Sequence, residues 1–77
     1  MRIQLEVPEA TTMYFPEEET SLPCGNGNLI AYMENGRYVL IHETAKGNRF
    51  CICNAVQRIS TVNKYAYLYG YYFMKEV

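Results

Sequence analysis

The sequence predicts an α+β fold that is mostly β: a small antiparallel sheet of four to five strands, with one short helix before the last strand. Three observations predict this class. An Asn-Gly pair separates two runs of β-forming residues, a second hairpin follows directly, and the hydrophobic period then changes from two to about 3.6 and back. At 77 residues, the chain is expected to form a single domain over residues 1–77.

The first hairpin is the clearest local pattern. Leu29 to Glu34 and Arg37 to Glu43 are rich in β-formers, and Asn35-Gly36 between them tolerates the positive φ angles of a type I′ turn. This turn sets the register, so that Glu34 faces Arg37. Both faces of the hairpin are apolar. The face turned away from Glu34 is expected to carry Leu29, Ala31, Met33, Tyr38, Leu40 and His42.

The second hairpin follows from the same reasoning. With Ala45-Lys46-Gly47 as a three-residue loop and Gly47 left-handed, Glu43 falls opposite Arg49. Each hairpin then closes with a pair of opposite charges, and a shift of one residue would break both pairs. In a regular strand after Arg49, Cys51 and Cys53 lie on the same face as Glu43.

The N-terminal part is expected to combine a strand with a long loop. Met1 to Val7 alternates apolar and polar residues, as a half-buried strand does, and Pro8 ends it. Residues 8–28 contain all three prolines and an acidic run, so we expect a long loop in which only Thr11 to Phe15 could form a short strand. Loops of this length in small domains are usually functional or disordered.

The segment from Asn54 to Lys64 predicts the helix. Apolar residues recur at Ala55, Ile59, Val62 and Ala66, and Asn54 is suited to the N-cap. Because β-branched residues lower helix propensity, a short extra strand is the alternative.

The last segment, Tyr65 to Val77, alternates again and is expected to be a strand. An uninterrupted strand would place five aromatic residues in one row, unless Gly70 inserts a bulge that splits it. These residues are Tyr65, Tyr67, Tyr69, Tyr71 and Phe73.

This order of elements resembles that of SH3-like small barrels, in which a long loop follows the first strand and a helical turn precedes the last. The resemblance implies that the sheet curls into a barrel. An open antiparallel sheet with the helix packed on one face is the alternative, because both faces of the hairpins are apolar and need covering.

Composition limits the function. A net charge of −1 argues against strong attraction to nucleic acid or to anionic membranes. Without a long apolar run, neither a transmembrane span nor a signal peptide is expected, and three cysteines, an odd number, indicate free thiols in the cytoplasm. One His, two Ser and no Asp are too few for general acid-base catalysis, so we expect no enzyme.

Two groups of residues resemble sites but are assigned structural roles. Cys24, His42, Cys51 and Cys53 are zinc-ligand types, yet they lack the closely spaced pairs of zinc knuckles, and the predicted register turns His42 away from Cys51 and Cys53. The glycines of Cys24 to Asn28 could hold a phosphate, but the segment leads into a strand and is expected to be a turn. We expect neither a metal nor a cofactor.

Two features predict binding to another protein. The run Glu17, Glu18 and Glu19 on the long loop would match a basic groove of a partner, including one that normally holds nucleic acid; a solvated surface is the simpler interpretation.

The tyrosines are the second feature. Tyr65, Tyr67, Tyr69 and Tyr71 would supply rigid anchors for a protein partner, with packing in the core as the alternative. A stacking platform for single-stranded nucleic acid would need more lysine and arginine around the tyrosines than the sequence provides.

The leading hypothesis is a small, non-enzymatic cytoplasmic protein that binds and occludes a partner protein. Small chains without motifs often come from phages or mobile elements, so the concrete prediction is an inhibitor of a host nuclease or defence complex. The alternative is a single-stranded nucleic-acid-binding module that uses the tyrosines. Pairing of an exposed edge strand, most easily the first or last, would give a homodimer.

Overall fold

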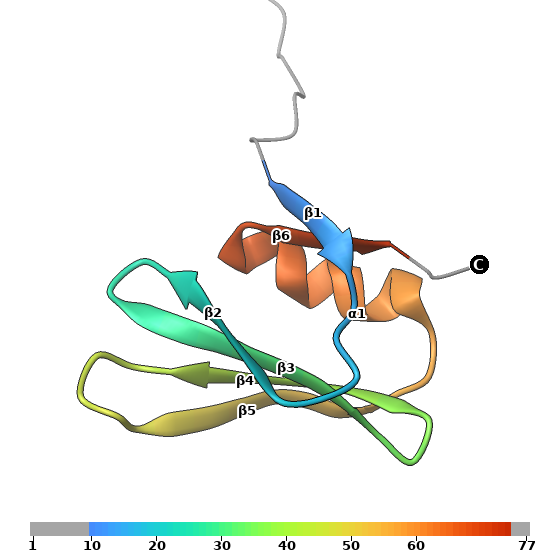
Figure 1. Ribbon diagram of the computed structural model, residues 1–77, viewed down its shortest axis with the longest axis horizontal. Helices are drawn as coiled ribbons and strands as arrows, with labels where there is room; N and C mark the ends of the chain where they lie inside the picture. Colours follow the sequence, from blue (N-terminus) through green and yellow to red (C-terminus); the bar gives the residue numbers. More distant parts are fainter. Residues whose placement is uncertain (1–9, 75–77) are drawn as a thin grey trace, which may run out of the picture.

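A computed structural model describes residues 10–74, and these form two β-sheets and one short helix (Figure 1). The elements in chain order are β1 (Thr11–Tyr14), β2 (Thr20–Cys24), β3 (Gly27–Glu34), β4 (Arg37–Glu43), β5 (Arg49–Val56), α1 (Ile59–Ala66), the 3-10 turn η1 (Tyr67–Tyr69) and β6 (Tyr71–Met74). The predicted class, mostly β with one short helix before the last strand, is confirmed. The predicted strand Met1 to Val7 lies outside the described residues.

The larger sheet has four antiparallel strands in the order β2-β3-β4-β5. The smaller sheet pairs β1 with β6 in parallel, and it lies with α1 over one face of the larger sheet (Figure 1). The larger sheet does not close, so the SH3-like barrel is wrong and the open sheet with a helix on one face is correct. Within residues 10–74, no helix is long and apolar enough to cross a membrane.

Both predicted hairpins are confirmed residue by residue. Glu34 pairs with Arg37 across Asn35-Gly36, whose φ angles are 53° and 76°. Glu43 pairs with Arg49, and the Gly47 N–H donates to the Thr44 carbonyl at 2.9 Å. Local turn chemistry therefore sets the register of β3, β4 and the start of β5.

The predicted loop over residues 8–28 contains two strands. The expected short strand is β1, but β2 was not predicted, because Pro23 and Cys24 carry no strand signal. Antiparallel pairing with β3 imposes the strand, and Leu22 supplies a buried side chain opposite Leu29. Gly25-Asn26 forms the hairpin turn between β2 and β3, so the turn predicted over Cys24 to Asn28 is confirmed at its centre, while its ends belong to the two strands.

The helix begins later than predicted. Asn54 was expected as N-cap, but β5 continues to Val56, because Val56 still pairs with Tyr38 of β4. Arg58 is the N-cap, in an extended conformation without a side-chain capping bond. The predicted apolar face is otherwise correct from Ile59 onward, since Val62 and Ala66 are buried.

The predicted last strand was wrong over its first half. Tyr65 belongs to α1 and Tyr67 to Tyr69 form η1, so the expected row of five aromatic residues does not exist. Gly70, with φ 87°, caps this helical segment in the left-handed conformation and reverses the chain into β6. The alternation of residues 65–69 is compatible with a strand, but burial of Ala66 against the sheet favours the helix.

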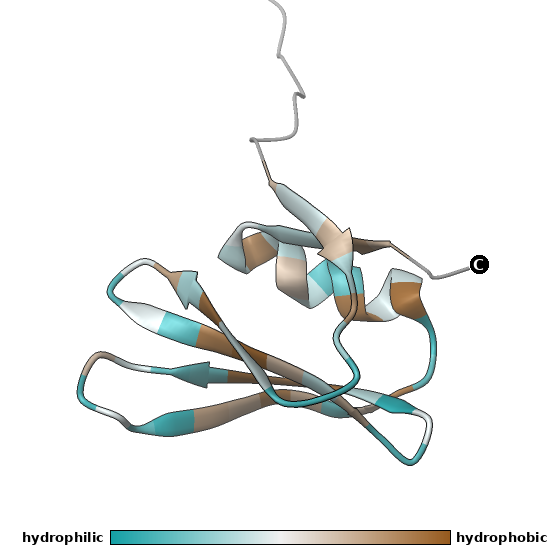
Figure 2. Cartoon of the chain, viewed as in Figure 1, coloured by the Kyte–Doolittle hydropathy of each residue, from teal (hydrophilic) through white to brown (hydrophobic). Residues whose placement is uncertain are grey.

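The main hydrophobic core lies between the larger sheet and the layer formed by α1, β1 and β6. The sheet contributes the face predicted to turn away from Glu34, and Phe73 of β6 is the largest fully buried side chain. Figure 2 shows hydrophobic residues in the middle of β3 and β4 and hydrophilic ones at their turns. The buried members of this core are Leu22, Leu29, Ala31, Leu40, Val62, Ala66, Tyr71 and Phe73.

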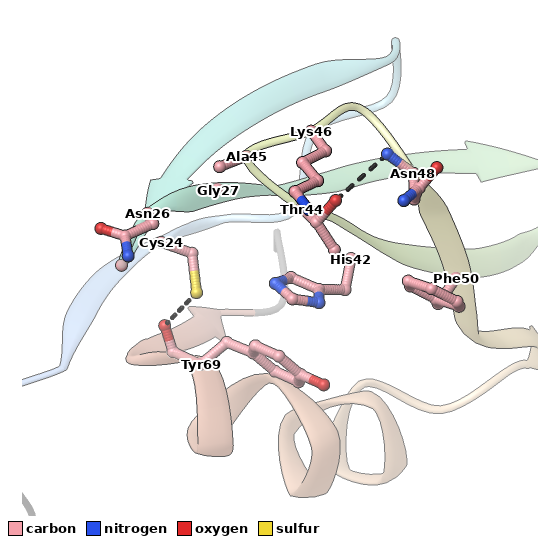
Figure 3. A pocket seen from close by; sticks show the side chains of 11 residues that line it. Cys24, Asn26, Gly27, His42, Thr44, Ala45, Lys46, Asn48, Phe50 and Tyr69 are labelled. Atoms are coloured by element: carbon pink, nitrogen blue, oxygen red, sulfur yellow. Dashed lines mark hydrogen bonds between the residues drawn. The ribbon is translucent and has the colours of Figure 1, made fainter.

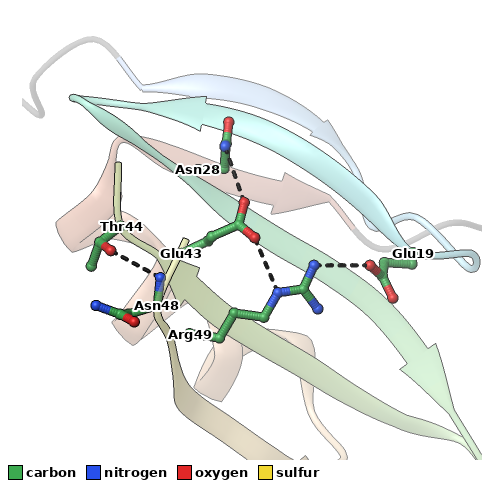
Figure 4. A network of polar contacts seen from close by, with 6 residues as sticks. All are labelled: Glu19, Asn28, Glu43, Thr44, Asn48 and Arg49. Carbon is green, nitrogen blue, oxygen red and sulfur yellow. Dashed lines mark hydrogen bonds and ion pairs between the residues drawn. The ribbon is translucent and has the colours of Figure 1, made fainter. Parts of the chain in front are cut away.

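The opposite face of the larger sheet carries a polar network that connects β3, β4 and β5 with the residue directly before β2 (Figure 4). Arg49 of β5 donates to Glu43 of β4 at 3.1 Å and pairs at 3.7 Å with Glu19, directly before β2. The Asn28 amide of β3 also donates to Glu43, at 3.3 Å. Because Arg49 and Glu19 are about half exposed, each ion pair contributes roughly 0–1 kcal/mol.

Candidate functional site

The acidic residues Glu17, Glu18 and Glu19 are exposed in the loop between β1 and β2. The backbone of this loop accepts two hydrogen bonds: the Met33 N–H donates to the Glu17 carbonyl at 3.2 Å, and the Thr20 hydroxyl donates to the Glu18 carbonyl at 2.8 Å. Glu19 is paired with Arg49. Glu17 and Glu18 form no ion pair with any described residue, so their charges face solvent.

The four predicted tyrosines occupy three different environments. Tyr65 and Tyr67 are exposed, Tyr69 is half-buried, and Tyr71 is buried at 8% exposure. The Tyr71 hydroxyl donates to the Pro23 carbonyl. Burial, and to a lesser degree the charge of an ionised Cys24, raises the pKa of Tyr71 above its ordinary value. Tyr71 therefore belongs to the core. Among the described residues, no hydrogen bond joins these four tyrosines to the three glutamates.

Other aromatic residues form an exposed surface on the smaller sheet. The parallel register pairs Thr12 with Tyr72 and Tyr14 with Met74, while Met13 and Phe73 of the alternate positions face the core. Tyr14 is 54% exposed and Tyr72 is 51% exposed. The outward side of this sheet thus presents large apolar side chains that the described residues leave uncovered.

Tyr67 extends this surface from the helical segment. The Asn63 amide donates to the Phe73 carbonyl at 2.9 Å and accepts from the Phe73 N–H at 2.8 Å, so this side of α1 faces β6. Tyr67 follows Asn63 by four residues and lies on the same side, one turn later. We call Tyr14, Tyr67, Tyr72 and Met74 the aromatic face. Three of them, Tyr14, Tyr72 and Met74, were not predicted as site residues from the sequence, because their common side is defined only by the pairing of β1 with β6.

A second candidate is an open groove at the end of the larger sheet (Figure 3). Its walls come from the β2–β3 turn, the β4–β5 turn, the neighbouring ends of β4 and β5, and η1, and its volume is about 610 Å³. His42 and Tyr69 contact each other across it, with ring centroids 5.4 Å apart. We call it the His42 groove. Its lining residues are Cys24, Gly25, Asn26, Gly27, His42, Thr44, Ala45, Lys46, Asn48, Phe50 and Tyr69.

The His42 groove lacks the arrangement of a hydrolytic site. The Cys24 thiol donates to the Tyr69 carbonyl at 3.6 Å, and burial raises its pKa above the ordinary value of 9.0. A thiol with a raised pKa is protonated at neutral pH and is a poor nucleophile. None of the described residues that line the groove is acidic, so none of them supplies a carboxylate that could orient His42.

The predicted zinc-ligand types do not come together in one place. Cys24 and His42 line the groove, whereas Cys51 is exposed on β5 and Cys53 packs against the core. Within residues 10–74, no three side chains of His, Cys, Asp or Glu are placed to hold a metal ion. All three thiols are free.

Comparisons of the chain with protein-family models, with curated proteins and with solved structures found no match.

Proposed function

We propose that this protein is a non-enzymatic binding protein that occludes the surface of a partner protein with its aromatic face. The observation that carries the proposal is the exposure of Tyr14 and Tyr72, each by more than half, at diagonal positions on the outward side of the β1–β6 sheet. Tyrosine is enriched at protein interfaces because it combines a large apolar ring with a hydroxyl and has few rotatable bonds. Exposed apolar patches commonly mark interaction sites.

The acidic loop adjoins this face. Glu17 follows Tyr14 by three residues, so their Cα atoms are at most about 11 Å apart. Glu17 and Glu18 are exposed next to an apolar surface, and within residues 10–74 neither forms an ion pair. A matching partner would present an apolar depression with a basic rim, and the opposite charges would accelerate association.

A basic rim around a binding depression is typical of proteins that hold nucleic acid. The finer proposal is therefore that the partner is a host nuclease or defence complex and that the protein, encoded by a phage or mobile element, inhibits it in the cytoplasm. Single-stranded nucleic acid is less favoured as the ligand of the tyrosines, because Gly70 divides their row and Tyr71 is buried.

The experiment is a pull-down from the lysate of the native host with nuclease treatment, followed by binding kinetics with the captured protein. The variant Y14S/Y72S should raise the dissociation rate at least tenfold, because it removes two central anchors. Replacing Glu17 and Glu18 by Gln should lower the association rate and its salt dependence.

The matched control is Y65S, which removes an exposed tyrosine from a different side of α1. It should bind like the unchanged protein. If Y14S/Y72S is folded and binds the partner with unchanged kinetics, the aromatic face is not the interface.

A further inference from the structure

Three aromatic side chains from three elements converge on the His42 groove (Figure 3). His42 comes from β4, Phe50 from β5 and Tyr69 from η1. His42 and Tyr69 are half-buried and support each other, with their ring planes tilted by 40°. Phe50 is 57% exposed, although it is among the most apolar side chains of the molecule. The groove therefore presents aromatic surface that a flat ligand would remove from water.

Polar groups surround these rings at the rim. Lys46 extends from the β4–β5 turn toward His42, and the amides of Asn26 and Asn48 lie on either side of the groove (Figure 3). Together they offer one positive charge and several hydrogen-bond donors and acceptors.

The charge of the groove differs from that of the whole chain. The chain has a net charge of −1 with eight acidic residues, yet none of those within residues 10–74 lines the groove. The nearest along the chain, Glu43, turns to the opposite face of the sheet, where Asn28 and Arg49 bind its carboxylate. An anion entering the groove would thus meet Lys46 without facing a carboxylate in the lining.

From these features we propose that the His42 groove binds a nucleotide, that is, a planar heteroaromatic base joined to a phosphate. The base stacks on Phe50 and Tyr69, and the phosphate lies toward Lys46. A volume of about 610 Å³ falls within the roughly 300–1,000 Å³ of small-molecule sites. Stacking accepts any base, while the Asn26 and Asn48 amides can bind polar atoms at its edge. This site shares no residue with the aromatic face and does not depend on the proposed function.

The test is titration of the isotope-labelled protein with adenosine 5′-monophosphate, followed by NMR at low ionic strength. Amide signals of His42, Phe50 and Tyr69 should shift in a saturable manner, while those of Tyr14 and Tyr72 stay unchanged. Adenosine and inorganic phosphate should each bind more weakly, since each lacks one half of the recognised chemistry. No shifts at millimolar ligand, or shifts confined to residues outside the groove, would overturn the proposal.

Two exposed positions allow variants with little risk to folding. F50L should weaken binding at least fivefold, because aromatic stacking is lost. K46Q should weaken it about two- to fivefold at low ionic strength, and this difference should disappear in high salt. The matched control is K64Q, which removes a lysine of α1 that does not line the groove and should leave the affinity unchanged. Equal affinities of F50L, K46Q and K64Q would contradict the assignment.

A free nucleotide and the end of a nucleic-acid strand share this chemistry, and oligonucleotides distinguish them. A hexanucleotide with a 5′-phosphate that binds as tightly as the monophosphate would support a strand end. Its exclusion, with the monophosphate still bound, would support a free nucleotide. If the hexanucleotide binds equally well without its terminal phosphate, Lys46 does not recognise a terminal phosphate and the proposal fails.

Discussion

Cys53 illustrates how one extra residue in a strand changes a side chain's environment. Cys51 pairs with Ile41 and Cys53 with Leu40, so Ile52 is an extra residue and forms a bulge. The regular strand expected from the sequence would have placed both cysteines on one face, and this expectation is wrong. The bulge turns Cys53 toward the core. Its burial, the largest effect, raises the pKa of the thiol above the ordinary value of 9.0.

The raised pKa makes the folding stability depend on alkaline pH. Above pH 9 the thiol ionises in the unfolded chain before it does so in the folded one, so the free energy of unfolding falls as the pH rises through the folded-state pKa. Below pH 9 this contribution is fully present. Urea unfolding at pH 7, 8, 9 and 10 should therefore give decreasing midpoints above pH 9.

The C53A variant tests the origin of this decrease. The substitution should make the fall of the urea midpoint above pH 9 less steep. It should not abolish this fall, since Cys24 and Tyr71 also have raised pKa values. Measurements between pH 7 and 8 provide the control. In this range the urea midpoints of the unchanged protein and of C53A should differ by the same amount at each pH. An equally steep decrease in both proteins above pH 9 would show that burial of Cys53 does not cause it.

At the scale of elements, Asn63 joins α1 to β6. Its side-chain amide forms two hydrogen bonds with the backbone of Phe73, one as donor and one as acceptor. The amide thus takes the place of a neighbouring strand at the edge of β6 that does not pair with β1. Asn63 is the one buried polar residue of the described chain, and the described residues leave no buried side-chain polar atom without a partner. A short helix without a capping side chain is thereby attached to a strand of four residues.

Replacing Asn63 by Ala should lower the free energy of unfolding by about 2–4 kcal/mol, because the Phe73 N–H and carbonyl lose their partner in a buried place. Urea unfolding followed by circular dichroism measures the change. The matched control is N54A, at an exposed asparagine of β5, which should change stability by less than about 0.5 kcal/mol. Similar stability of N63A and N54A would mean that water replaces the amide at no cost.

At the scale of the whole molecule, Phe15 connects the two layers. Its ring packs edge to face against two other rings. The ring centroids are 4.7 Å apart for Phe73 of β6 and 4.8 Å apart for Tyr38 of β4. Phe15 follows β1 directly, and the preceding residue, Tyr14, points outward. The two neighbouring aromatic residues thus have different roles. Phe15 packs the smaller sheet against the larger one, and Tyr14 belongs to the proposed interface.

Phe15→Ala should lower the free energy of unfolding by about 2–4 kcal/mol, slightly less than for a fully buried phenylalanine. Tyr14→Ala should change it by less than about 1 kcal/mol but should weaken binding to the partner. Thermal unfolding of both variants, with binding kinetics for Tyr14→Ala, separates the two roles. A larger loss of stability for Tyr14→Ala than for Phe15→Ala would contradict the assignment of the two faces.

The features that could be predicted from the sequence are those that depend on neighbours along the chain. Local geometry leaves few alternatives for these features, because turn conformation and side-chain period are set by adjacent residues. They are the turns at Asn35-Gly36 and Gly47, the charge pairs Glu34–Arg37 and Glu43–Arg49, and the apolar face of α1.

The contacts that join distant segments are visible only in the folded structure. The parallel pairing of β1 with β6 defines the aromatic face, yet no local rule predicts that Thr11 lies beside Tyr71. The helical form of Tyr65 to Tyr69 and the bulge at Ile52 likewise depend on burial against the sheet. The His42 groove combines residues that the sequence presented separately, as a glycine turn, a lone histidine and a tyrosine. Contacts between distant segments have no local pattern, because they are selected by the burial of apolar surface in the whole fold.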